Sequence, residues 1–261
     1  MQIAIIGAGN IGQAIIQGLI QSETVAASEL FVADINEESL RLVKEIDEAI
    51  ETTTDNLKAV AKAGMIILAV KPWLVETVLE NISSTFDKKQ QLLLSVAAGV
   101  NFSVLEKRLG NDATIFRIMP NTAISIGESM TLIASRNATQ EQEEQALALF
   151  AHLGKAFLVS QAQLEAATSV ASCGIAYALR YLRAATAGAI ELGLPAEMAQ
   201  EIVAQTMKGA AELILQNNGH AEAEIDKVTT PGGWTIKGLN AMEEKGFTAA
   251  VIAGLKANSI D

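Results

Sequence analysis

The chain has 261 residues, of which 50% are hydrophobic and 19% charged, a globular composition with enough apolar material for a sizeable core. Its formal net charge of −11, with no concentrated basic patch, argues against nucleic acid and acidic membrane surfaces as partners. One cysteine cannot form an internal disulfide, so we expect a reducing, cytosolic location. Met1 leads directly into an apolar segment without the features of a signal peptide.

Short apolar segments alternate with helical stretches over residues 1–160, which we predict to be a dinucleotide-binding domain. Such segments are typical of parallel strands buried on both faces, so the pattern predicts an α/β fold with a doubly wound, mostly parallel sheet. The expected strands are 3–6, 31–33, 65–70, 92–98, 115–119, 130–134 and 156–159.

The pattern becomes helical from about residue 161, which predicts an all-helical domain over 161–261. The most apolar stretch, 166–194, contains Arg180, Arg183 and Glu191, and these charges favour a buried helix over a membrane span. Its small residues suit close helix packing, either in an intramolecular core or at a subunit interface. The expected helices are 164–194, 195–217, 234–244 and 248–258.

The motif 7-GAGNIG-12 follows the apolar strand 3–6 and opens a helix. Gly7 permits a tight turn, Gly9 lets a pyrophosphate approach the backbone, and Gly12 lets the helix pack on the strand. N–H groups at the helix start suit a phosphate. The alternative is a glycine turn without a ligand. The candidate cofactor-binding residues are Gly7, Ala8, Gly9, Asn10, Ile11 and Gly12.

Asp34 follows the second strand, where a dinucleotide fold places the acid that binds the adenosine ribose. A carboxylate there repels a 2′-phosphate, and neither Ile35 nor Asn36 is basic, which favours NADH over NADPH. Two alternatives remain open. Asp34 could cap the next helix, and Arg41 or Lys44 could still reach a phosphate.

Two later strands end in small residues or proline, 69-AVKP-72 and 95-SVAAG-99, at the edge of the sheet where α/β ligands bind. Small side chains leave room for a ring. Lys71 could bind an anion or remain solvated. Residues 119–122 end another strand and are a candidate for the nicotinamide side.

The loop 228-VTTPGGWTI-236 contains no His, carboxylate or Cys. A proline and two glycines before a helix give a turn whose N–H groups can bind an anion. Thr230 can add a hydroxyl to the same anion. The alternative is an ordinary helix start, with Thr230 as N-cap and Pro231 as the first helical residue.

Three residues with reactive side chains are not expected to form a site. Cys173 has no His near it in sequence, so packing in a helix is the favoured interpretation. His152 and His220 are too isolated to predict a metal site.

The motifs 7-GAGNIG-12, 69-AVKP-72, 118-IMPNTAISIGESMT-131, 191-ELGLP-195 and 228-VTTPGGWTIKGLNAMEEKGF-247 together resemble the pyrroline-5-carboxylate reductase family. The resemblance implies a dinucleotide domain, a helical dimerisation domain and an active site between them that a partner subunit helps to close. It implies reduction of a cyclic imine carboxylate, 1-pyrroline-5-carboxylate, to proline with NADPH or NADH, the last step of proline biosynthesis. The resemblance further implies that the protein forms a homodimer or an assembly of dimers through the helical domain.

The resemblance also assigns roles to residues. The glycine turn holds the pyrophosphate, and Asn56 contacts the adenosine side. Thr235 is the catalytic candidate, placed to hydrogen-bond the ring nitrogen. The residues that line the cofactor near its nicotinamide are Ala69, Val70, Lys71, Pro72, Val96, Ala97 and Ala98. The substrate-binding residues are Thr230, Gly232, Gly233 and Trp234.

The chain departs from the family pattern at three places. At the positions of Asp34 and Ile35, members of the family commonly carry a polar residue followed by Arg. The different pair in this chain puts the family's usual use of NADPH in doubt. Ile175 replaces the proline of the family's helix kink in 171-ASCGIAY-177. Trp234 stands where relatives usually have a small residue, which can reshape the pocket.

Reduction of an iminium needs orientation more than acid–base groups, which explains a substrate loop without them. Two alternatives stay open. A 3-hydroxyacid dehydrogenase needs a base such as a lysine on the long helix, and residues 166–194 contain none. A dinucleotide sensor without chemistry is compatible with the departures at 171–175 and Trp234. A six-membered homologue of the imine is an open alternative as substrate.

Overall fold

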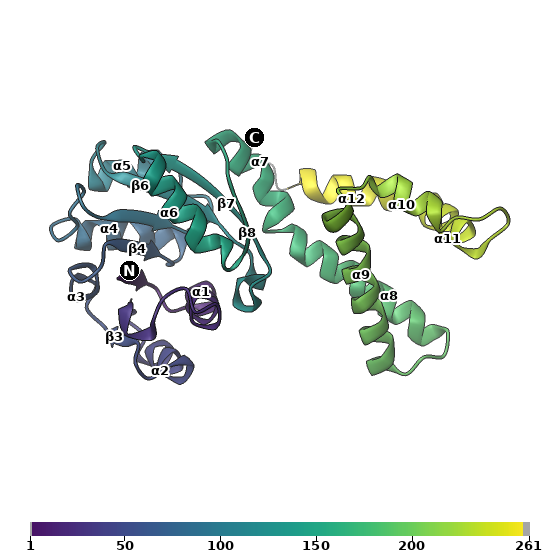
Figure 1. The fold of residues 1–261 in the computed structure, drawn as a ribbon, viewed down its shortest axis with the longest axis horizontal. Coiled ribbons are helices and arrows are strands. Elements are labelled where there is room, and N and C mark those ends of the chain that lie inside the picture. The colour runs from purple at the N-terminus through teal and green to yellow at the C-terminus, as the bar shows by residue number, and fades with distance from the viewer. Residues whose placement is uncertain (1, 258–261) are drawn as a thin grey trace. The chain divides into compact units, whose positions relative to one another are not determined.

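The computed structural model describes residues 2–257, which form two compact units (Figure 1). The first unit extends to Ser172 and contains the sheet, and the second begins at Cys173 and is helical. Helix α7 (Gln161–Ala171) packs on strands β6 and β7 of the sheet. The division by contacts therefore falls after this helix, whereas the strand pattern in the sequence ends near residue 160.

The elements are as follows. The strands are β1 (Ile3–Ile6), β2 (Leu30–Ala33), β3 (Glu51–Thr53), β4 (Met65–Leu68), β5 (Leu92–Ser95), β6 (Thr114–Met119), β7 (Ser129–Arg136) and β8 (Gly154–Leu158). The other helices of the first unit are α1 (Asn10–Gln21), η1 (Ala27–Glu29), α2 (Glu37–Ile46), α3 (Asn56–Val60), η2 (Pro72–Leu74), α4 (Val75–Ile82), α5 (Phe102–Leu109), η3 (Thr122–Ile126) and α6 (Gln140–Ala151). The second unit contains α8 (Gly174–Glu191), α9 (Ala196–Asn217), α10 (Ala221–Lys227), α11 (Trp234–Glu244) and α12 (Phe247–Lys256).

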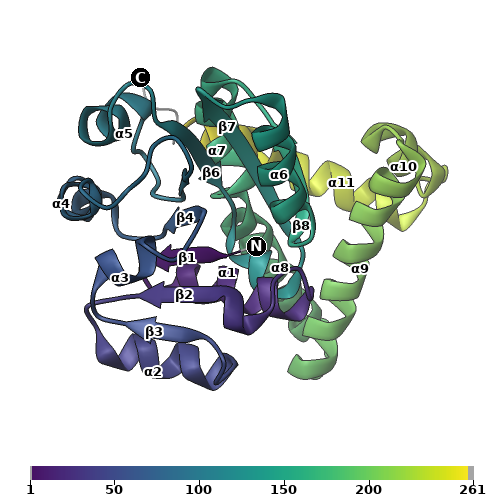
Figure 2. The ribbon, with the colours of Figure 1, turned by 60° about the vertical axis from the view of Figure 1, so that its left-hand side comes forward.

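The sheet has the strand order β3-β2-β1-β4-β5-β6-β7-β8 (Figure 2). Strands β1 to β6 are parallel, β7 is antiparallel to β6, and β8 is parallel to β7. The chain runs from β1 out to β3 and then returns to β4 on the other side of β1. The strand order therefore reverses between β1 and β4, and this is where open α/β sheets bind their ligands. The predicted fold class is confirmed.

Helices cover both faces of the sheet. Helices α1, α2 and α6 pack on one face, where Ile15 and Phe150 are fully buried. Helices α3, α4, α5 and α7 pack on the other face, where Leu79 and Leu105 are fully buried. Strands between two helical layers bury both faces, which is why their sequences are apolar without alternation.

The sequence patterns missed two elements and merged two others. Strand β3 consists of Glu51, Thr52 and Thr53, which are polar because the strand lies at the edge of the sheet. Helix α10 is short and was not predicted. The single helix predicted at 164–194 is wrong, because the chain breaks at Ser172 and Cys173 between α7 and α8. Asn258, the predicted last helical residue, lies outside the described residues.

The second unit has almost no core of its own. Within 173–257, Ala199 is the only buried residue. Helix α8 buries none of its residues, so the prediction of a buried helix at 166–194 is wrong for this part in a single chain. Between residues 2 and 257, no helix is long and apolar enough to cross a membrane.

Candidate functional site

Two glycines of the turn after β1 are required by the packing of the chain on itself. Gly7 has φ +103°, and a Cβ there would lie 2.5 Å from the Ala69 carbonyl oxygen. A Cβ on Gly12 would lie 2.1 Å from the Gly7 carbonyl oxygen. These glycines therefore let the end of β4 approach the turn and let α1 pack on it, as the motif predicts.

Gly9 has no such requirement. Its φ of −74° suits any residue, and a Cβ there would meet no atom within 4 Å. Gly9 is the N-cap of α1, and no side chain caps this helix. The N–H groups in the first turn of α1 therefore have no side-chain partner. They lie beside Gly9, and the packing of the chain does not explain why this residue is a glycine. This arrangement fits a pyrophosphate on the helix N-terminus.

The Asp34 carboxylate reaches the glycine turn. Its Oδ2 accepts the Ala8 N–H at 2.6 Å, and its Oδ1 accepts the Asn36 N–H at 2.8 Å. The cap of α2 is Asn36, whose side chain accepts the Glu38 N–H at 2.9 Å. The alternative that Asp34 caps this helix is therefore wrong.

The ends of β4 and β5 lie beside the same turn. The Ala69 N–H donates to the Ile6 carbonyl at 2.7 Å, and the Val96 N–H donates to the Leu68 carbonyl at 3.0 Å. Among the predicted residues here, the buried ones are Ala69, Val96 and Ala97, Val70 is half-buried, and the exposed ones are Lys71, Pro72 and Ala98. Most of the predicted cofactor residues thus lie on connected strand ends.

Asn56 and Lys71 are less closely tied to the turn. Asn56 is the first residue of α3, and its Nδ2 donates to Asn81 Oδ1 at 3.3 Å. It follows β3, the neighbour of β2, so it lies on the same edge of the sheet as Asp34. Lys71 is exposed and makes no ion pair with any residue from 2 to 257.

Arg41 and Lys44 are engaged elsewhere. Arg41 Nε donates to Glu38 at 2.9 Å, and its guanidinium also bonds Glu45. The hydrogen bond that Arg41 donates to the Glu38 carboxylate, together with the negative charge of Glu38, raises the pKa of the Arg41 guanidinium above its ordinary value. Lys44 Nζ donates to the Glu48 carbonyl at 2.8 Å. Both cations therefore already have partners on or after α2.

The predicted substrate loop lies in the second unit. The Gly233 N–H donates to the Thr230 carbonyl at 2.9 Å, and Gly232 has φ +70°. With Pro231 before Gly232, this matches a type II turn. Helix α11 begins at Trp234, and Gly233 is its N-cap without a side-chain hydrogen bond. The alternative in which Thr230 caps the helix at Pro231 is therefore wrong.

The side chains of this loop point to solvent or over the turn. A Cβ on Gly233 would lie 2.5 Å from Thr230 Oγ1, so the Thr230 hydroxyl covers this glycine. Trp234 is 91% exposed. The Thr235 side chain is exposed and makes no hydrogen bond with any residue from 2 to 257. Both hydroxyls and the indole are accessible to a small molecule in the single chain.

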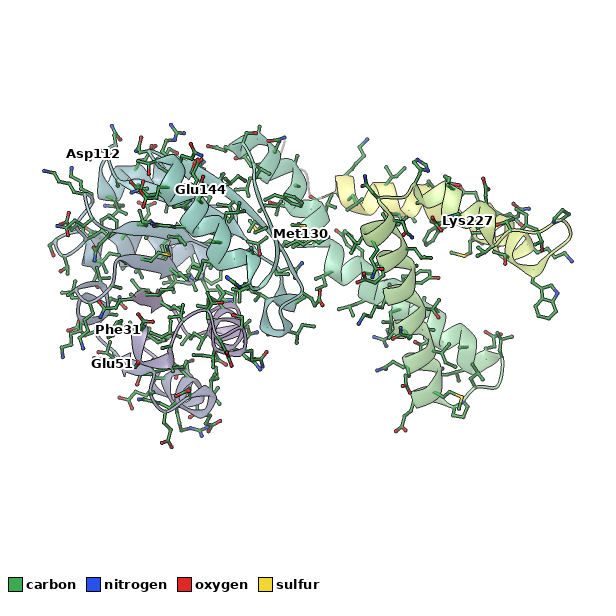
Figure 3. The ribbon with its side chains drawn as sticks, in the orientation of Figure 1. Phe31, Glu51, Asp112, Met130, Glu144 and Lys227 are labelled. Carbon is green, nitrogen blue, oxygen red and sulfur yellow. The ribbon has the colours of Figure 1, made fainter. Side chains whose placement is uncertain are left out.

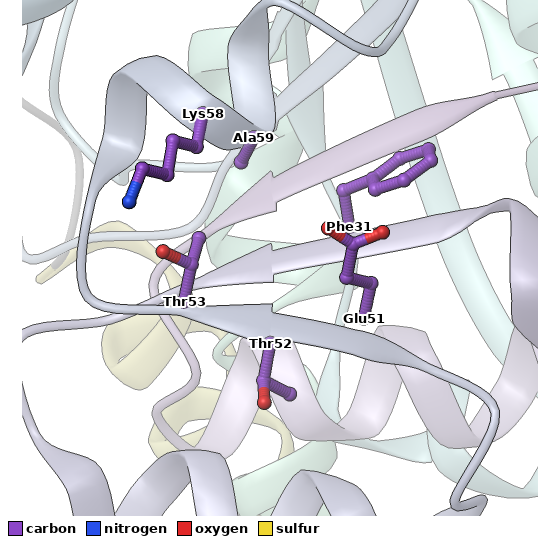
Figure 4. A pocket seen from close by; sticks show the side chains of 6 residues that line it. All are labelled: Phe31, Glu51, Thr52, Thr53, Lys58 and Ala59. Atoms are coloured by element: carbon purple, nitrogen blue, oxygen red, sulfur yellow. The ribbon is translucent and has the colours of Figure 1, made fainter.

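A hollow of about 240 Å³ lies elsewhere, over the edge of the sheet (Figure 4). Phe31 of β2 and Glu51 of β3 lie next to each other in this region (Figure 3). The hollow contains none of the predicted site residues, and we do not assign it a ligand. Its lining residues are Phe31, Glu51, Thr52, Thr53, Lys58 and Ala59.

Two polar side chains in and just after β6 make contacts with α7 that the sequence did not predict. Arg117 is 6% exposed within the strand, with its guanidinium 3.3 Å from Glu165 of α7. Asn121 Nδ2 donates to the Ala171 carbonyl at the end of α7, at 3.0 Å. A charged residue within the apolar segment 115–119 was the available signal for Arg117. Asn121 lies in 119–122, which the sequence proposed for the nicotinamide side, and no signal indicated its contact with α7. No cluster of metal-binding side chains occurs in residues 2–257.

Comparisons with known proteins cover both units. Residues 161–259 match the family described as pyrroline-5-carboxylate reductase dimerisation, and residues 2–99 match the family described as NADP oxidoreductase, coenzyme F420-dependent. Pyrroline-5-carboxylate reductase 1 of Dictyostelium discoideum is 38% identical over 98% of this chain, which spans 48% of that protein. Pyrroline-5-carboxylate reductase 2 of the same organism is 37% identical, with 97% and 89% of the two chains covered.

A solved structure agrees with these matches. The crystal structure of 1-pyrroline-5-carboxylate reductase from Streptococcus pyogenes superposes with a TM-score of 0.88 at 30% identity, and covers 99% of this chain and 96% of its own. The resemblance seen in the motifs is thereby confirmed. Because relatives above 30% identity match it almost from end to end, the chain belongs to the pyrroline-5-carboxylate reductase family.

Proposed function

We propose that the protein reduces 1-pyrroline-5-carboxylate to proline with a nicotinamide cofactor, the last step of proline biosynthesis. The observation that carries this proposal is family membership over both units, combined with a glycine turn whose Gly9 is left open. When bound, the dinucleotide supplies a hydride for the C=N carbon. The chain's own task is then to bind and orient two molecules, which needs few acid–base groups.

The first unit holds the cofactor on the edge of the sheet where β1 and β4 end. The open position at Gly9 and the uncapped start of α1 fit the pyrophosphate. Asp34 fits the ribose, because each of its oxygens keeps a free lone pair beside one backbone N–H. The proposed cofactor-binding residues are Gly7, Ala8, Gly9, Asn10, Ile11, Gly12, Asp34, Asn56, Ala69, Val70, Lys71, Pro72, Val96, Ala97 and Ala98.

We propose that NADH is preferred over NADPH. The Asp34 carboxylate repels a 2′-phosphate, and Ile35, which is 85% exposed, supplies no cation beside it. The two nearby cations, Arg41 and Lys44, already bond groups of their own segment. A 2′-phosphate would therefore lose solvation near a negative charge without gaining a free partner.

The second unit holds the substrate. The turn at Pro231 and Gly232 presents N–H groups at the uncapped start of α11 to the substrate carboxylate, and the Thr230 hydroxyl adds a donor. Gly233 lies under that hydroxyl, and Trp234 is available to cover a ring. Thr235, whose hydroxyl has no protein partner, is proposed to bond the ring nitrogen and hold its proton. The proposed substrate is the five-membered imine.

We also propose a homodimer, or an assembly of dimers, formed through the helical unit. A helical unit in which Ala199 is the one buried residue among 173–257 cannot hold its fold by its own core. Large apolar side chains stay exposed along α8 and α9, and a second copy would cover them. A cytosolic location is proposed from the single cysteine.

Steady-state kinetics of Thr235→Ala test the proposal. Loss of one hydrogen bond to a charged group costs about 1–3 kcal/mol, so kcat/KM for the imine should fall roughly 5- to 150-fold. Thr235→Ser should restore most of the loss. The matched control is Thr77→Ala, because Thr77 is also exposed and makes no side-chain hydrogen bond with residues 2–257. An unchanged kcat/KM in Thr235→Ala discards the role, and absence of turnover in the unmodified protein discards the function.

A further inference from the structure

The side chain of Asn121 makes two hydrogen bonds that join two parts of the first unit. Its Oδ1 accepts the Ala123 N–H at 3.0 Å, and its Nδ2 donates to the Ala171 carbonyl at 3.0 Å. The backbone N–H of Asn121 donates to Ser129 Oγ at 3.2 Å. A side-chain amide has one acceptor atom and one donor atom. In Asn121 the acceptor bonds the start of η3 and the donor bonds the end of α7. The orientation of the side chain is therefore fixed by its partners.

One of these parts is connected to the cofactor turn. Asn121 caps η3, and η3 packs against α1, the helix that the glycine turn opens. The contact is close, because a Cβ on Gly18 of α1 would lie 2.6 Å from the Ile124 carbonyl oxygen. A shift of η3 would therefore displace α1, because the two helices are in direct contact.

The other part is the exit from the first unit. Ala171 is the last residue of α7, and the chain passes from there through Ser172 into the second unit. Helix α7 is held along its length, by Leu164 in the core and by the pair of Glu165 with buried Arg117. Its last turn is held to the sheet edge by Asn121.

We propose that Asn121 is a positioning residue that fixes the end of α7, and with it the point where the substrate-carrying unit is attached, relative to the cofactor helix. The inference rests on the proposed function, since its kinetic consequence concerns hydride transfer. A looser attachment spreads the positions of the substrate loop, and misplacement of about 1 Å can lower a rate by two orders of magnitude. Residues 119–122 are sequence candidates for the nicotinamide side. We nevertheless expect unchanged cofactor binding when only the link to α7 is lost, because the cap on η3 and the contact of η3 with α1 then remain.

Asn121→Asp separates the two roles of this side chain. Asp caps a helix start as well as Asn does, so η3 and the fold are retained. A carboxylate has no N–H for the Ala171 carbonyl, so the link to α7 is lost. We expect kcat to fall roughly tenfold or more, while the Kd for NADH, measured by fluorescence, stays within twofold. Amide exchange of residues 168–172, whose last member donates to the Thr168 carbonyl, should become faster.

Asn111→Asp is the matched control, since Asn111 is exposed in the loop before β6 and makes no side-chain hydrogen bond with residues 2–257. It introduces the same charge and should leave kcat and exchange unchanged. A kcat within twofold of the unmodified protein in Asn121→Asp overturns the proposal, and so does a parallel rise in the NADH Kd. If the unmodified protein shows no turnover, the proposed function fails separately, and unchanged exchange at 168–172 then refutes the link.

Discussion

The three glycines of the turn after β1 differ in why they are glycine. Gly7 and Gly12 face backbone atoms of the chain itself, whereas Gly9 faces open space. The sequence motif does not distinguish the three glycines. The structure shows that Gly7 and Gly12 are required by contacts within the chain, whereas Gly9 is not, so a bound ligand is the remaining reason for a glycine there. The open position at Gly9 is the strongest local support for a bound phosphate.

A pair of alanine substitutions tests this distinction. Gly9→Ala should cost less than about 1 kcal/mol of stability, the loss of a favourable N-cap, but should raise the NADH Kd at least tenfold. Gly12→Ala should cost about 2 kcal/mol or more, because its Cβ overlaps the Gly7 carbonyl. Thermal unfolding and NADH titration of both variants give the answer. Unchanged NADH affinity in Gly9→Ala would contradict the assignment of the site.

Asp34, for which we propose a role in cofactor specificity, also has a structural contact, since its carboxylate accepts the Ala8 N–H. Asp34→Ser with Ile35→Arg should raise the ratio of kcat/KM for NADPH over NADH at least tenfold, by removing repulsion and adding a cation. Activity with NADH should fall as well, because the shorter serine loosens the turn. Glu37→Ser, which removes a nearby exposed charge, is the control and should leave the ratio unchanged. An unmodified protein that already prefers NADPH would refute the cofactor proposal.

Elements were predictable where one local signal dominated. The buried strands could be predicted because each is a short apolar segment. The ends of α9 could be predicted from Pro195 and Asn218, which flank the helix. Strand β3 was missed because an edge strand needs no apolar sequence. The pattern of apolar residues missed the break between α7 and α8, because Ser172 and Cys173 are compatible with a continuous helix. The family resemblance, in contrast, indicates a kink at 171–177.

Site contacts follow the same rule. Positions in the glycine motif and at strand ends could be predicted, because each is a local pattern followed by a known geometry. The bonds from Asp34 to Ala8 and from Asn121 to Ala171 join residues 26 and 50 positions apart. No periodicity encodes such bonds, so they appear only in the folded chain.

The turn proposed to bind the substrate, at Pro231 and Gly232, depends on a left-handed backbone conformation at Gly232. Gly232 has φ +70°, and a Cβ there would meet no atom within 4 Å. The substitution Gly232→Ala would therefore strain the backbone without causing a steric clash. Left-handed backbone costs a non-glycine residue about 1–2 kcal/mol, so the turn should be populated less. We expect KM for the imine to rise severalfold with the NADH Kd unchanged. Gly238→Ala, within α11 and in open space, is the control. An unaltered KM in Gly232→Ala would remove the turn from the substrate site.

At the scale of the whole molecule, the two units differ in how they are stabilised. The first has a core on both faces of its sheet, and the second exposes residues such as Ile202, Leu213 and Leu215 along α9. Association that buries this surface should make the unfolding temperature rise with protein concentration. Sedimentation velocity combined with thermal unfolding at several concentrations checks this. A stable monomer with a concentration-independent Tm would contradict the dimer.

The central claim is hydride transfer from the nicotinamide to the carbon of a cyclic imine, and isotope transfer tests it most directly. The protein is incubated with 1-pyrroline-5-carboxylate and NADH that carries two deuterium atoms at C4 of the nicotinamide. We predict proline with one non-exchangeable deuterium at C5, detected by mass spectrometry and NMR. Unlabelled proline, or no proline while NADH still binds, would contradict the account.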